Sequence, residues 1–385
     1  MGGVKQMMIE YEESNIGFIK DTFVCTRHIS DYAVRNFIKK STQKGKCSYC
    51  DKKGKVVTLI ELMDLILFGI GLIYEDAANW MSYDSEEGGY LGKTYDNYEL
   101  IDELLEIDKY ELQQDITNGI ADITWSTRND YYSTEAELLD ENWKLFKEVV
   151  KYKNRYLFTQ SSKFKTDEDN RKPFDVFNNI SSAILPLNLL TKISIKTKLF
   201  RARQHNFEEK VETLIDIAST PKEYAVYSNR MSPAGISMFY CTFDKETSKL
   251  ETVERNKDKT HISIGTFLGK KEFCVIDFTR LFNVSVFDKE KQAYFYISQF
   301  LKSFIKDLSK DIQKDGKEHI EYVPTQIVTE FFRYVYSEAN KISIDGIVYP
   351  SSKSIDKNAC VLFFDSDECI KELQLVKIES NVLKF

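Results

Sequence analysis

Four side chains near the start of the chain have the types and the spacing of a metal site. Two residues separate Cys25 from His28, two separate Cys47 from Cys50, and 18 residues lie between the two pairs. A two-residue gap lets both side chains of a pair reach one ion, and zinc prefers thiolate sulfur and imidazole nitrogen as ligands. The pattern predicts a structural zinc ion, since four protein ligands leave no open position for catalysis. The alternative is a chance coincidence of two unrelated pairs.

A second set of side chains, in the other half of the chain, has the types that recognise phosphate and stabilise positive charge. Arg201 and Arg203 alternate along an expected strand in "KLFRARQHN" and therefore share one of its faces. The stretch "NRMSPAGISMFYCTFDKETSKLETV" carries Arg230, Tyr240 and Glu251. A planar guanidinium group matches two phosphate oxygens at once, and a carboxylate stabilises a cation that forms beside it.

Ser351 follows an expected strand that ends at Tyr349 and Pro350 in "DGIVYPSSKS". A serine at a strand end can donate a hydrogen bond to a phosphate or a ribose. Taken one by one, all these residues also have ordinary roles: arginines on the surface of an edge strand, a core tyrosine, a solvated glutamate at a helix start and a turn serine. Their joint occurrence in one order favours a functional site.

In this order and spacing the segments resemble the RES domain, a family named for its arginine, glutamate and serine. The family's fold and activity are similar to those of ADP-ribosyltransferase toxins, and the resemblance covers Lys196 to Phe364. The matched positions, in chain order, are Arg201, Arg230, Pro233, Gly235, Tyr240, Glu251 and Ser351. The chain departs from the family in "RMSPAG", where an arginine, an aromatic residue and Asn-Pro-x-Gly are more usual, and Ser352 is an alternative to Ser351.

The resemblance implies that NAD is the substrate and that the chemistry needs no metal. Arg201 and Arg203 would bind its phosphates, and Arg230 would bind a phosphate or order the turn that follows it. Tyr240 would pack on nicotinamide or on its ribose. Glu251 would face the oxocarbenium-like cation that forms when nicotinamide leaves.

Ser351 would orient the dinucleotide, which completes a site for cleaving NAD. The predicted function is a toxin or defence enzyme that consumes NAD as a glycohydrolase or a phosphorylase. An ADP-ribosyltransferase that acts on a protein or a small molecule would use the same residues and is the alternative. A third reading, from another class, is a zinc-knuckle protein that binds nucleic acid or a partner and carries an inactive RES domain.

The first half of the chain is similar to the HEPN-like N-terminal domain that is fused to some RES domains. HEPN nucleases use an arginine followed by a histidine, but the helical part after the knuckle contains no histidine, and Arg128 in "TRNDYYS" lacks this partner. We therefore expect a scaffold, a regulator or a dimerising domain, and RNA cleavage by this half would contradict the expectation. A neutralising antitoxin or a trigger and a homodimer are the partners that such an enzyme implies.

The elements that would position these residues indicate an α+β protein. Apolar residues recur at helical spacing in the first half, and short β-rich runs dominate from Lys196 onward. Helices are predicted over 56–74, 98–107, 136–158, 180–190, 292–308 and 325–339. Strands are predicted over 196–204, 237–243, 261–267, 273–282, 341–350 and 359–365.

The predicted organisation has three parts. A mostly helical domain with the cysteine and histidine knuckle covers 1–165, and a linker with a connecting helix covers 166–190. An ADP-ribosyltransferase-like RES domain, with a mixed β-sheet and helices, covers 191–385.

Composition and charge exclude several classes of protein. Hydrophobic residues make up 42% and aromatic residues 13% of the 385, which indicates a folded chain. The formal net charge of −7 argues against nucleic acid and against an anionic membrane as partners. Glu61 and Asp64 interrupt the most apolar stretch, so a buried helix is expected there and not a membrane span. With seven cysteines and no secretory signal, the protein is expected to be cytoplasmic with reduced thiols.

Overall fold

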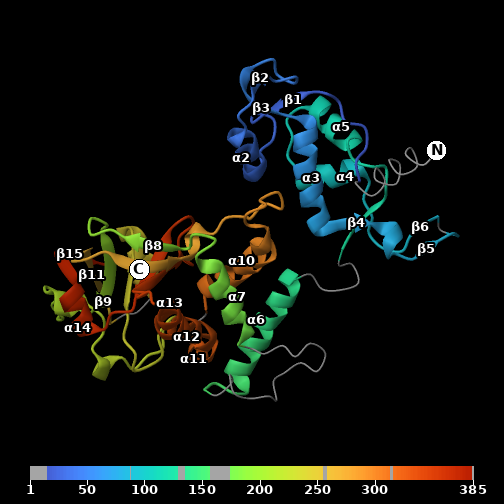
Figure 1. The fold of residues 1–385 in the computed structure, drawn as a ribbon. Helices are drawn as coiled ribbons and strands as arrows, with labels where there is room; N and C mark the ends of the chain where they lie inside the picture. Colours follow the sequence, from blue (N-terminus) through green and yellow to red (C-terminus); the bar gives the residue numbers. More distant parts are fainter. Residues whose placement is uncertain are drawn as a thin grey trace, which may run out of the picture. The chain divides into compact units, whose positions relative to one another are not determined.

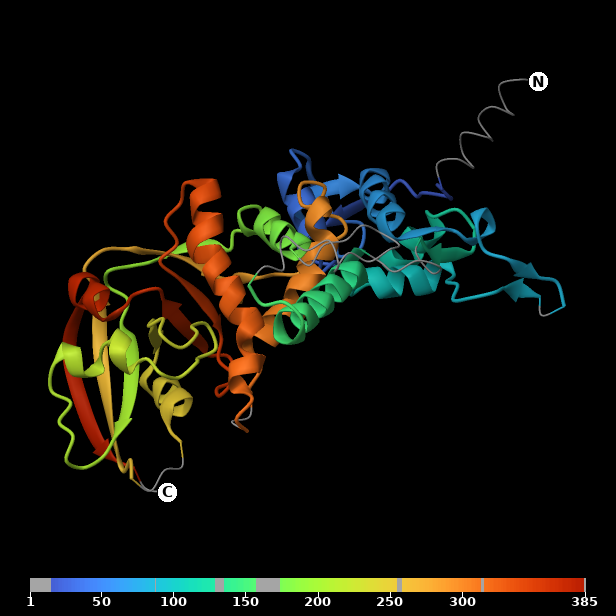
Figure 2. The same cartoon turned by 90° about the horizontal axis from the view of Figure 1, so that it is seen from below.

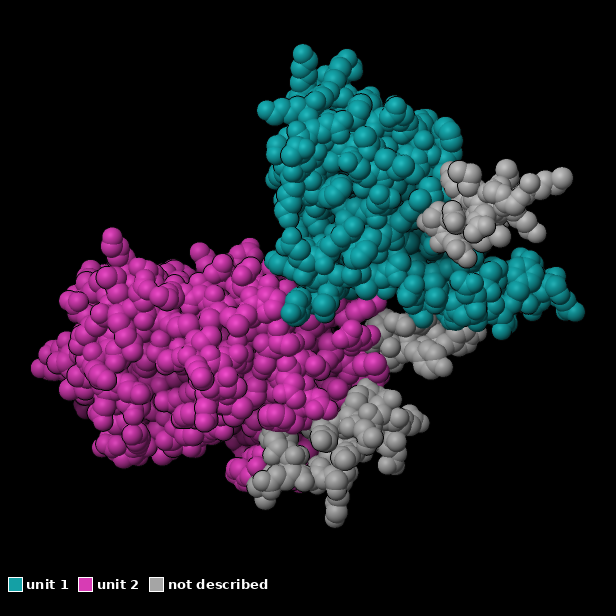
Figure 3. Space-filling model, in the orientation of Figure 1, with its two compact units in different colours: residues 1–134, 283–295 teal, residues 135–282, 296–385 magenta. Residues whose placement is uncertain are grey.

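The computed structural model describes residues 15–86, 88–128, 135–156, 174–254, 258–312 and 315–383. The fold is α+β, as predicted, and its elements are labelled in Figure 1. The chain forms two compact units, coloured separately in Figure 3: unit 1 comprises 1–134 and 283–295, and unit 2 comprises 135–282 and 296–385. Of the expected linker over 166–190, residues 166–173 lie outside the described part of the chain.

Unit 1 is built around helix α3 (Leu59–Ile73), which is apolar along most of its length and largely buried. A capping box starts it: the Thr58 hydroxyl accepts from the Glu61 backbone N–H at 3.3 Å, and the Glu61 carboxylate accepts from the Thr58 N–H at 2.9 Å. The helix therefore begins at Leu59 and not at Val56, because strand β3 (Lys53–Thr58) occupies the residues before it.

The remaining elements of unit 1 are short. Strands β1, β3 and β2 form an antiparallel three-stranded sheet in that order, and two further antiparallel pairs join β4 to β7 and β5 to β6. The bounds are β1 Phe23–Cys25, α2 Tyr32–Lys40, β2 Lys44–Lys46, β4 Tyr74–Asp76, η1 Ala77–Asn79, β5 Tyr83–Asp84, β6 Gly89–Tyr90, α4 Asn97–Leu104, α5 Tyr110–Asn118, β7 Trp125–Thr127 and η5 Gln292–Tyr294.

A segment from the second half of the chain, residues 283–295, completes the core of unit 1. Phe287 is buried there, and its ring occupies the space beside Gly69 of α3: a Cβ added to this glycine would lie 2.3 Å from Cδ1 of the ring. The Tyr32 hydroxyl donates to Asp288 at 2.8 Å and accepts from the Ser285 N–H at 3.3 Å. Unit 1 thus depends on residues that are remote in sequence.

Unit 2 contains an eight-stranded sheet with the order β15-β11-β9-β10-β14-β13-β12-β8. Its strands lie side by side with a marked twist in Figures 1 and 2, and β12 and β13 form the parallel pair in an otherwise antiparallel sheet. The bounds are β8 Leu190–Ile193, β9 Leu199–His205, β10 Phe239–Thr242, β11 His261–Gly269, β12 Phe273–Asp277, β13 Gly346–Pro350, β14 Asn358–Leu362 and β15 Leu373–Val382.

The six predicted strands are present, but the two at the edges of the sheet, β8 and β15, were not predicted. The predicted helix over 180–190 in fact covers Asp175–Ile184, as α7. Asn188 adopts a left-handed conformation with φ of 55°, which separates α7 from β8. Strand β15 is exposed over much of its length, and it therefore lacks the apolar alternation that marks a half-buried strand.

The helices of unit 2 include the one predicted over 136–158, which forms α6. Its Trp143 ring lies 5.1 Å from the Phe304 ring of α10, and the Trp143 Nε1–H donates to the Asp307 carboxylate at 2.8 Å. The helix predicted over 325–339 is present as α12, a π-helical turn and α13 in succession. The bounds are α6 Glu135–Tyr152, α8 Leu214–Ile217, η3 Lys222–Tyr224, α9 Lys245–Thr252, η4 Phe278–Arg280, α10 Phe295–Ser309, α11 Glu318–Glu321, α12 Val323–Glu330, η6 Phe331–Tyr336, α13 Ser337–Asn340 and α14 Ser366–Glu372.

No helix in the described ranges combines the length and the apolar character that crossing a bilayer requires.

Two glycines of α3, Gly69 and Gly71, allow a test of the packing of segment 283–295 against this helix. A methyl group at Gly69 would collide with the Phe287 ring, so we expect Gly69→Ala to destabilise unit 1 by about 1–3 kcal/mol. At Gly71 no atom lies within 4 Å of an added Cβ, and Gly71→Ala should stabilise the helix by about 0.5–1 kcal/mol. Hydrogen exchange of the α3 amides in the full chain would measure both changes. Equal protection in the two variants would contradict this packing.

Candidate functional site

Arg201, in the middle of β9, is the residue around which the candidate site is arranged. Its Nε–H donates to the carbonyl of Ile217 at 3.1 Å, and its Nη1–H donates to the carbonyl of Tyr240 at 2.9 Å. The guanidinium carbon lies 5.4 Å from the centre of the Phe239 ring. Burial lowers the pKa of Arg201 from its usual value, because water no longer solvates the charge. The side chain thus joins β9, β10 and the end of α8.

Arg203 lies two residues along β9, on the same face, as predicted. Its guanidinium donates to the carbonyl of Asp216 and forms an ion pair with the carboxylate of Glu209. Both predicted arginines therefore lie beside the end of α8. The guanidinium of Arg201 is bonded to carbonyls, and that of Arg203 is also paired with a carboxylate.

Two neighbouring cavities adjoin these arginines. The smaller has a volume of about 120 Å³ and is lined by Arg201, Tyr240, Glu251 and Tyr349, among others. The larger has a volume of about 480 Å³, and both Arg201 and Arg203 contribute to its wall. The two cavities are neighbours, because Arg201, Ala202 and Thr252 contribute to the walls of both.

Glu251 lines the smaller cavity, and Ser351, 100 residues further along the chain, contacts its carboxylate. Asp244 caps α9 by accepting from the Thr247 N–H at 2.9 Å, and the helix then places Glu251 in its last turn. Glu251 is thus exposed at a helix end, and not at a helix start. The hydroxyl of Ser351 donates to the Glu251 carboxylate and accepts from the Lys353 N–H at 3.1 Å. Of the two adjacent serines, Ser351 is the one whose hydroxyl contacts the glutamate.

Tyr240 contributes to the wall of the smaller cavity, but its hydroxyl is bonded to the loop before β10. The oxygen accepts from the Met231 N–H at 3.1 Å and shares a hydrogen bond of 3.0 Å with the Ser232 hydroxyl. Burial raises the pKa of Tyr240 to about 12. The hydroxyl therefore holds the loop, and what remains for a ligand is the surface of the ring.

Arg230 lines neither of these two cavities. Its Nη1–H donates to the carbonyl of Leu308 at the end of α10, 2.9 Å away, and its own carbonyl accepts from the Thr325 hydroxyl. Gly235, in the turn that follows, has φ of 87°, a conformation that glycine adopts without strain. Of the two roles expected for Arg230, these contacts favour ordering the turn.

Tyr349 is a cavity residue to which the sequence analysis gave no role. It is buried at the end of β13 and lines the smaller cavity together with Glu251. Burial raises its pKa well above the usual value. Its place two residues before Ser351, on a strand that ends at the site, was the signal that could have identified it.

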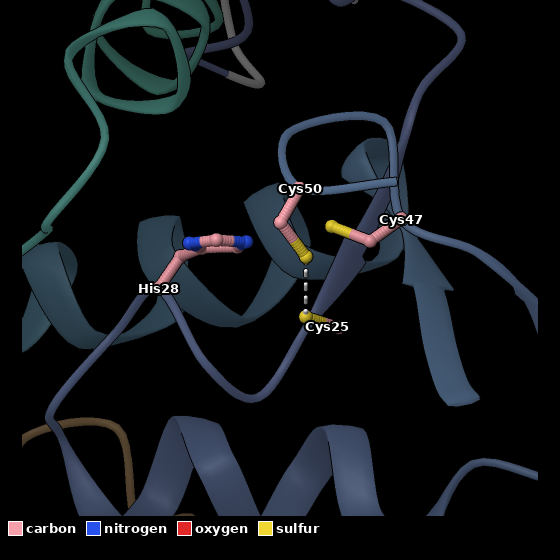
Figure 4. Close-up of side chains that lie close together, drawn as sticks. All are labelled: Cys25, His28, Cys47 and Cys50. Carbon is pink, nitrogen blue, oxygen red and sulfur yellow. Dashed lines mark hydrogen bonds between the residues drawn. The ribbon is translucent and has the colours of Figure 1, made fainter. Parts of the chain in front are cut away.

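The predicted metal ligands come together in unit 1. The ligand atoms of Cys25, His28, Cys47 and Cys50 all lie within 4.8 Å of one another, and one ring nitrogen of His28 faces the thiols in Figure 4. The sulfur atoms of Cys25 and Cys50 are 3.8 Å apart. Two sulfurs that each lie about 2.3 Å from one tetrahedral zinc ion would be about 3.8 Å apart. The cluster could therefore hold a metal ion.

The histidine gives an independent test of this fit. His28 is buried, and its Nδ1 is 2.7 Å from the carboxylate of Asp108. Its Nε2 is buried and has no hydrogen-bond partner within the described residues. A metal-ligating histidine typically gives its other N–H to a carboxylate, which leaves one nitrogen free for the ion. The donor set and the orphaned nitrogen both fit zinc.

The charges around the cluster also suit a cation bound by thiolates. A backbone hydrogen bond from Lys52 lowers the pKa of Cys50 to about 6, whereas burial raises the pKa of Cys25 to about 11. Arg27 donates toward both sulfurs, at 3.8 and 3.9 Å. A bound cation would favour the thiolate form of Cys25, which burial alone disfavours.

Comparison with known families gives two matches. All residues of the candidate site around Arg201 lie within one of them. HEPN/RES N-terminal domain 1 matches residues 40–164, and the RES domain matches residues 198–379. No curated protein and no solved structure matches the chain. RES domains have NAD-related activities of the toxin and defence type, and this general class of function applies here. The chain is a RES-domain protein with an N-terminal HEPN/RES domain.

Proposed function

We propose that unit 2 consumes NAD by cleaving the bond between nicotinamide and ribose. The observation that carries the proposal is that Ser351 contacts Glu251, which lines one cavity together with Arg201 and Tyr240. Four residues from separate segments thus converge, and their types suit a dinucleotide that develops a positive charge. The RES family, with its NAD-related activity, supports the same substrate.

The cleavage step assigns one role to each side chain. The C1′–N bond breaks, its electron pair goes to the ring nitrogen of nicotinamide, and positive charge develops on the ribose. The Glu251 carboxylate stabilises that charge, and the Ser351 hydroxyl holds the carboxylate in place. Arg201 presents its charge to the pyrophosphate, and the ring of Tyr240 packs against nicotinamide or its ribose.

The acceptor that completes the reaction decides which enzyme this is. Water attacking C1′ loses a proton and gives ADP-ribose, whereas phosphate gives ADP-ribose 1″-phosphate. A nucleophile on a protein or a small molecule would make the enzyme a transferase. All three reactions use the same cation and the same Glu251, so the acceptor has to be identified by experiment.

Glu251 is the residue whose replacement should affect turnover most. We expect Glu251→Gln to lower the rate of NAD loss by about 10²-fold or more, because the amide keeps the shape and removes the charge that stabilises the cation. The measurement is NAD concentration over time with purified protein, with and without added phosphate. If added phosphate raises the rate of NAD loss by the parent protein, the reaction is phosphorolysis. If added phosphate leaves that rate unchanged, the reaction is hydrolysis.

Glu246 provides the matched control, since it lies on the same helix, is exposed and lines neither cavity. Glu246→Gln should leave NAD loss unchanged. If both variants consume NAD as fast as the parent protein, Glu251 has no part in the reaction. If the parent protein binds NAD without consuming it, transfer to an absent target becomes the better explanation.

The two adjacent serines can be separated in the same assay. Ser351→Ala removes the hydroxyl that donates to Glu251. We expect the rate of NAD loss to fall on the order of tenfold, which corresponds to the free energy of one hydrogen bond to a charged group. Ser352→Ala should leave the rate close to that of the parent protein. A larger effect from Ser352 would reassign the serine role.

For unit 1 we propose a structural zinc ion bound by Cys25, His28, Cys47 and Cys50. The ion would fasten β1 to the turn before β3, and since all four ligands come from the protein it would have no catalytic position. Its contribution is to hold the fold together, because ligand groups that are scattered in the unfolded chain meet only in the folded one.

The zinc proposal predicts one zinc ion per chain in the purified protein. Cys47→Ser should lose that ion and also the hydrogen-exchange protection of the amides around β1 and β3, because the ligand set becomes incomplete. Cys274→Ser, which changes a thiol of unit 2 outside the cluster, is the control and should keep full zinc content. Full zinc content in Cys47→Ser would show that the ion is bound elsewhere.

A further inference from the structure

The larger cavity contains groups that the cleavage step leaves unused. It adjoins the smaller cavity at Arg201, and its volume of about 480 Å³ is four times the 120 Å³ of the cavity that holds Glu251. NAD is itself asymmetric: the bond to be broken lies at the nicotinamide end, and the pyrophosphate lies in the middle. If Glu251 marks the nicotinamide ribose, the remainder of the dinucleotide has to lie on the other side of Arg201.

Two exposed apolar side chains form part of the wall of this larger cavity. Tyr224 is 70% exposed and Ile215 is 61% exposed, although both line a concave site. Flat aromatic rings that stay in water at a binding site suit the stacking of a nucleobase, which covers the ring and its apolar neighbour together. The wall therefore has a surface for a base.

The segment that carries Tyr224 is fixed in position by several contacts. The Lys222 ammonium lies 3.1 Å from the carboxylate of Asp365, and the Ser219 hydroxyl donates to the carbonyl of Phe364 at 2.8 Å. The Tyr224 N–H donates to the carbonyl of Pro221 at 2.9 Å. A wall that is ordered before binding loses little entropy when the ligand arrives.

The charges of the cavity suit a phosphate next to the base. Three cationic residues, Arg201, Arg203 and Lys259, line it together with two acidic ones, Asp216 and Glu254. The Asp216 carboxylate accepts from the N–H and the hydroxyl of Thr213 at the start of α8, so one of its oxygens is engaged within the protein. Of the three cations, Arg201 lines both cavities, so one positive group lies where the two cavities adjoin.

We propose that the larger cavity binds the adenosine diphosphate half of NAD. Adenine stacks on Tyr224 beside Ile215, and the pyrophosphate lies at Arg201 and Arg203. The nicotinamide ribose then enters the smaller cavity and reaches Glu251. This assignment rests on the proposed function for the identity of the dinucleotide, and it adds the direction in which the dinucleotide lies and the residue on which its base stacks.

The test compares NAD with nicotinamide mononucleotide, which contains the same scissile bond but lacks the adenylate half. We expect Tyr224→Ala to lower the preference for NAD over the mononucleotide, as the ratio of the two kcat/KM values, by about tenfold, because base stacking is lost. Tyr224→Phe keeps the ring and should keep the preference. Tyr227→Ala is the matched control, since Tyr227 is 81% exposed, lies three residues away and lines neither cavity.

A binding measurement separates failure of this site from failure of the proposed function. The probe is ADP, titrated calorimetrically into the parent protein and into Tyr224→Ala. Weaker ADP binding by the variant supports the site even if the parent protein never consumes NAD, in which case the proposed function alone falls. Unchanged ADP binding together with an unchanged NAD preference overturns the adenosine diphosphate site, whatever the rate of NAD loss. Absence of ADP binding by the parent protein also overturns it.

Discussion

A half-buried guanidinium group on the large sheet is the constraint on which the candidate site depends. A charge removed from water is costly unless hydrogen bonds replace the solvent, and Arg201 obtains these from the carbonyls of Ile217 and Tyr240. Both bonds use the planar fork of the side chain, so they also fix the end of α8 and strand β10 relative to β9. The same group forms part of the common wall of the two cavities, so the arginine supports the fold and also faces both cavities.

A comparable arrangement holds the cysteine and histidine cluster in unit 1. Tyr49, between Cys47 and Cys50, donates its hydroxyl hydrogen bond to the buried carboxylate of Asp115 at 2.9 Å, and Lys20 pairs with the same carboxylate. The turn that carries Cys47 and Cys50 is therefore also bonded to helix α5 through Tyr49 and Asp115. A knuckle integrated in this way suits a structural ion, whereas a nucleic-acid module would present its knuckle to solvent with basic residues free for phosphates.

The spacing of apolar residues along the sequence was enough to predict most helices and inner strands. It failed where contacts between residues distant in sequence determine the structure. Helix α10 and the six inner strands have apolar spacing that follows from being buried on one or both faces. Strand β15 exists because β11 offers it a long antiparallel partner, and that pairing leaves no mark on the sequence of β15 itself. Likewise, nothing in residues 283–295 indicates that they complete the core of unit 1, because the matching feature is the absence of a side chain at Gly69.

The same limit applies to the candidate site: its residue types could be predicted from the sequence, but their contacts could not. The residues were identified from their types and order, but only the three-dimensional structure distinguishes those that face a cavity from those that support it. Tyr240 and Arg230 direct their polar groups into the loop before β10 and to the end of α10, so both act mainly on the shape of the wall. Glu251 instead lines the smaller cavity, and its carboxylate is bonded to the Ser351 hydroxyl. A motif of this kind therefore contains two classes of residue: the tyrosine and the second arginine hold the loop, and the carboxylate and the hydroxyl are the groups to which the proposed chemistry is assigned.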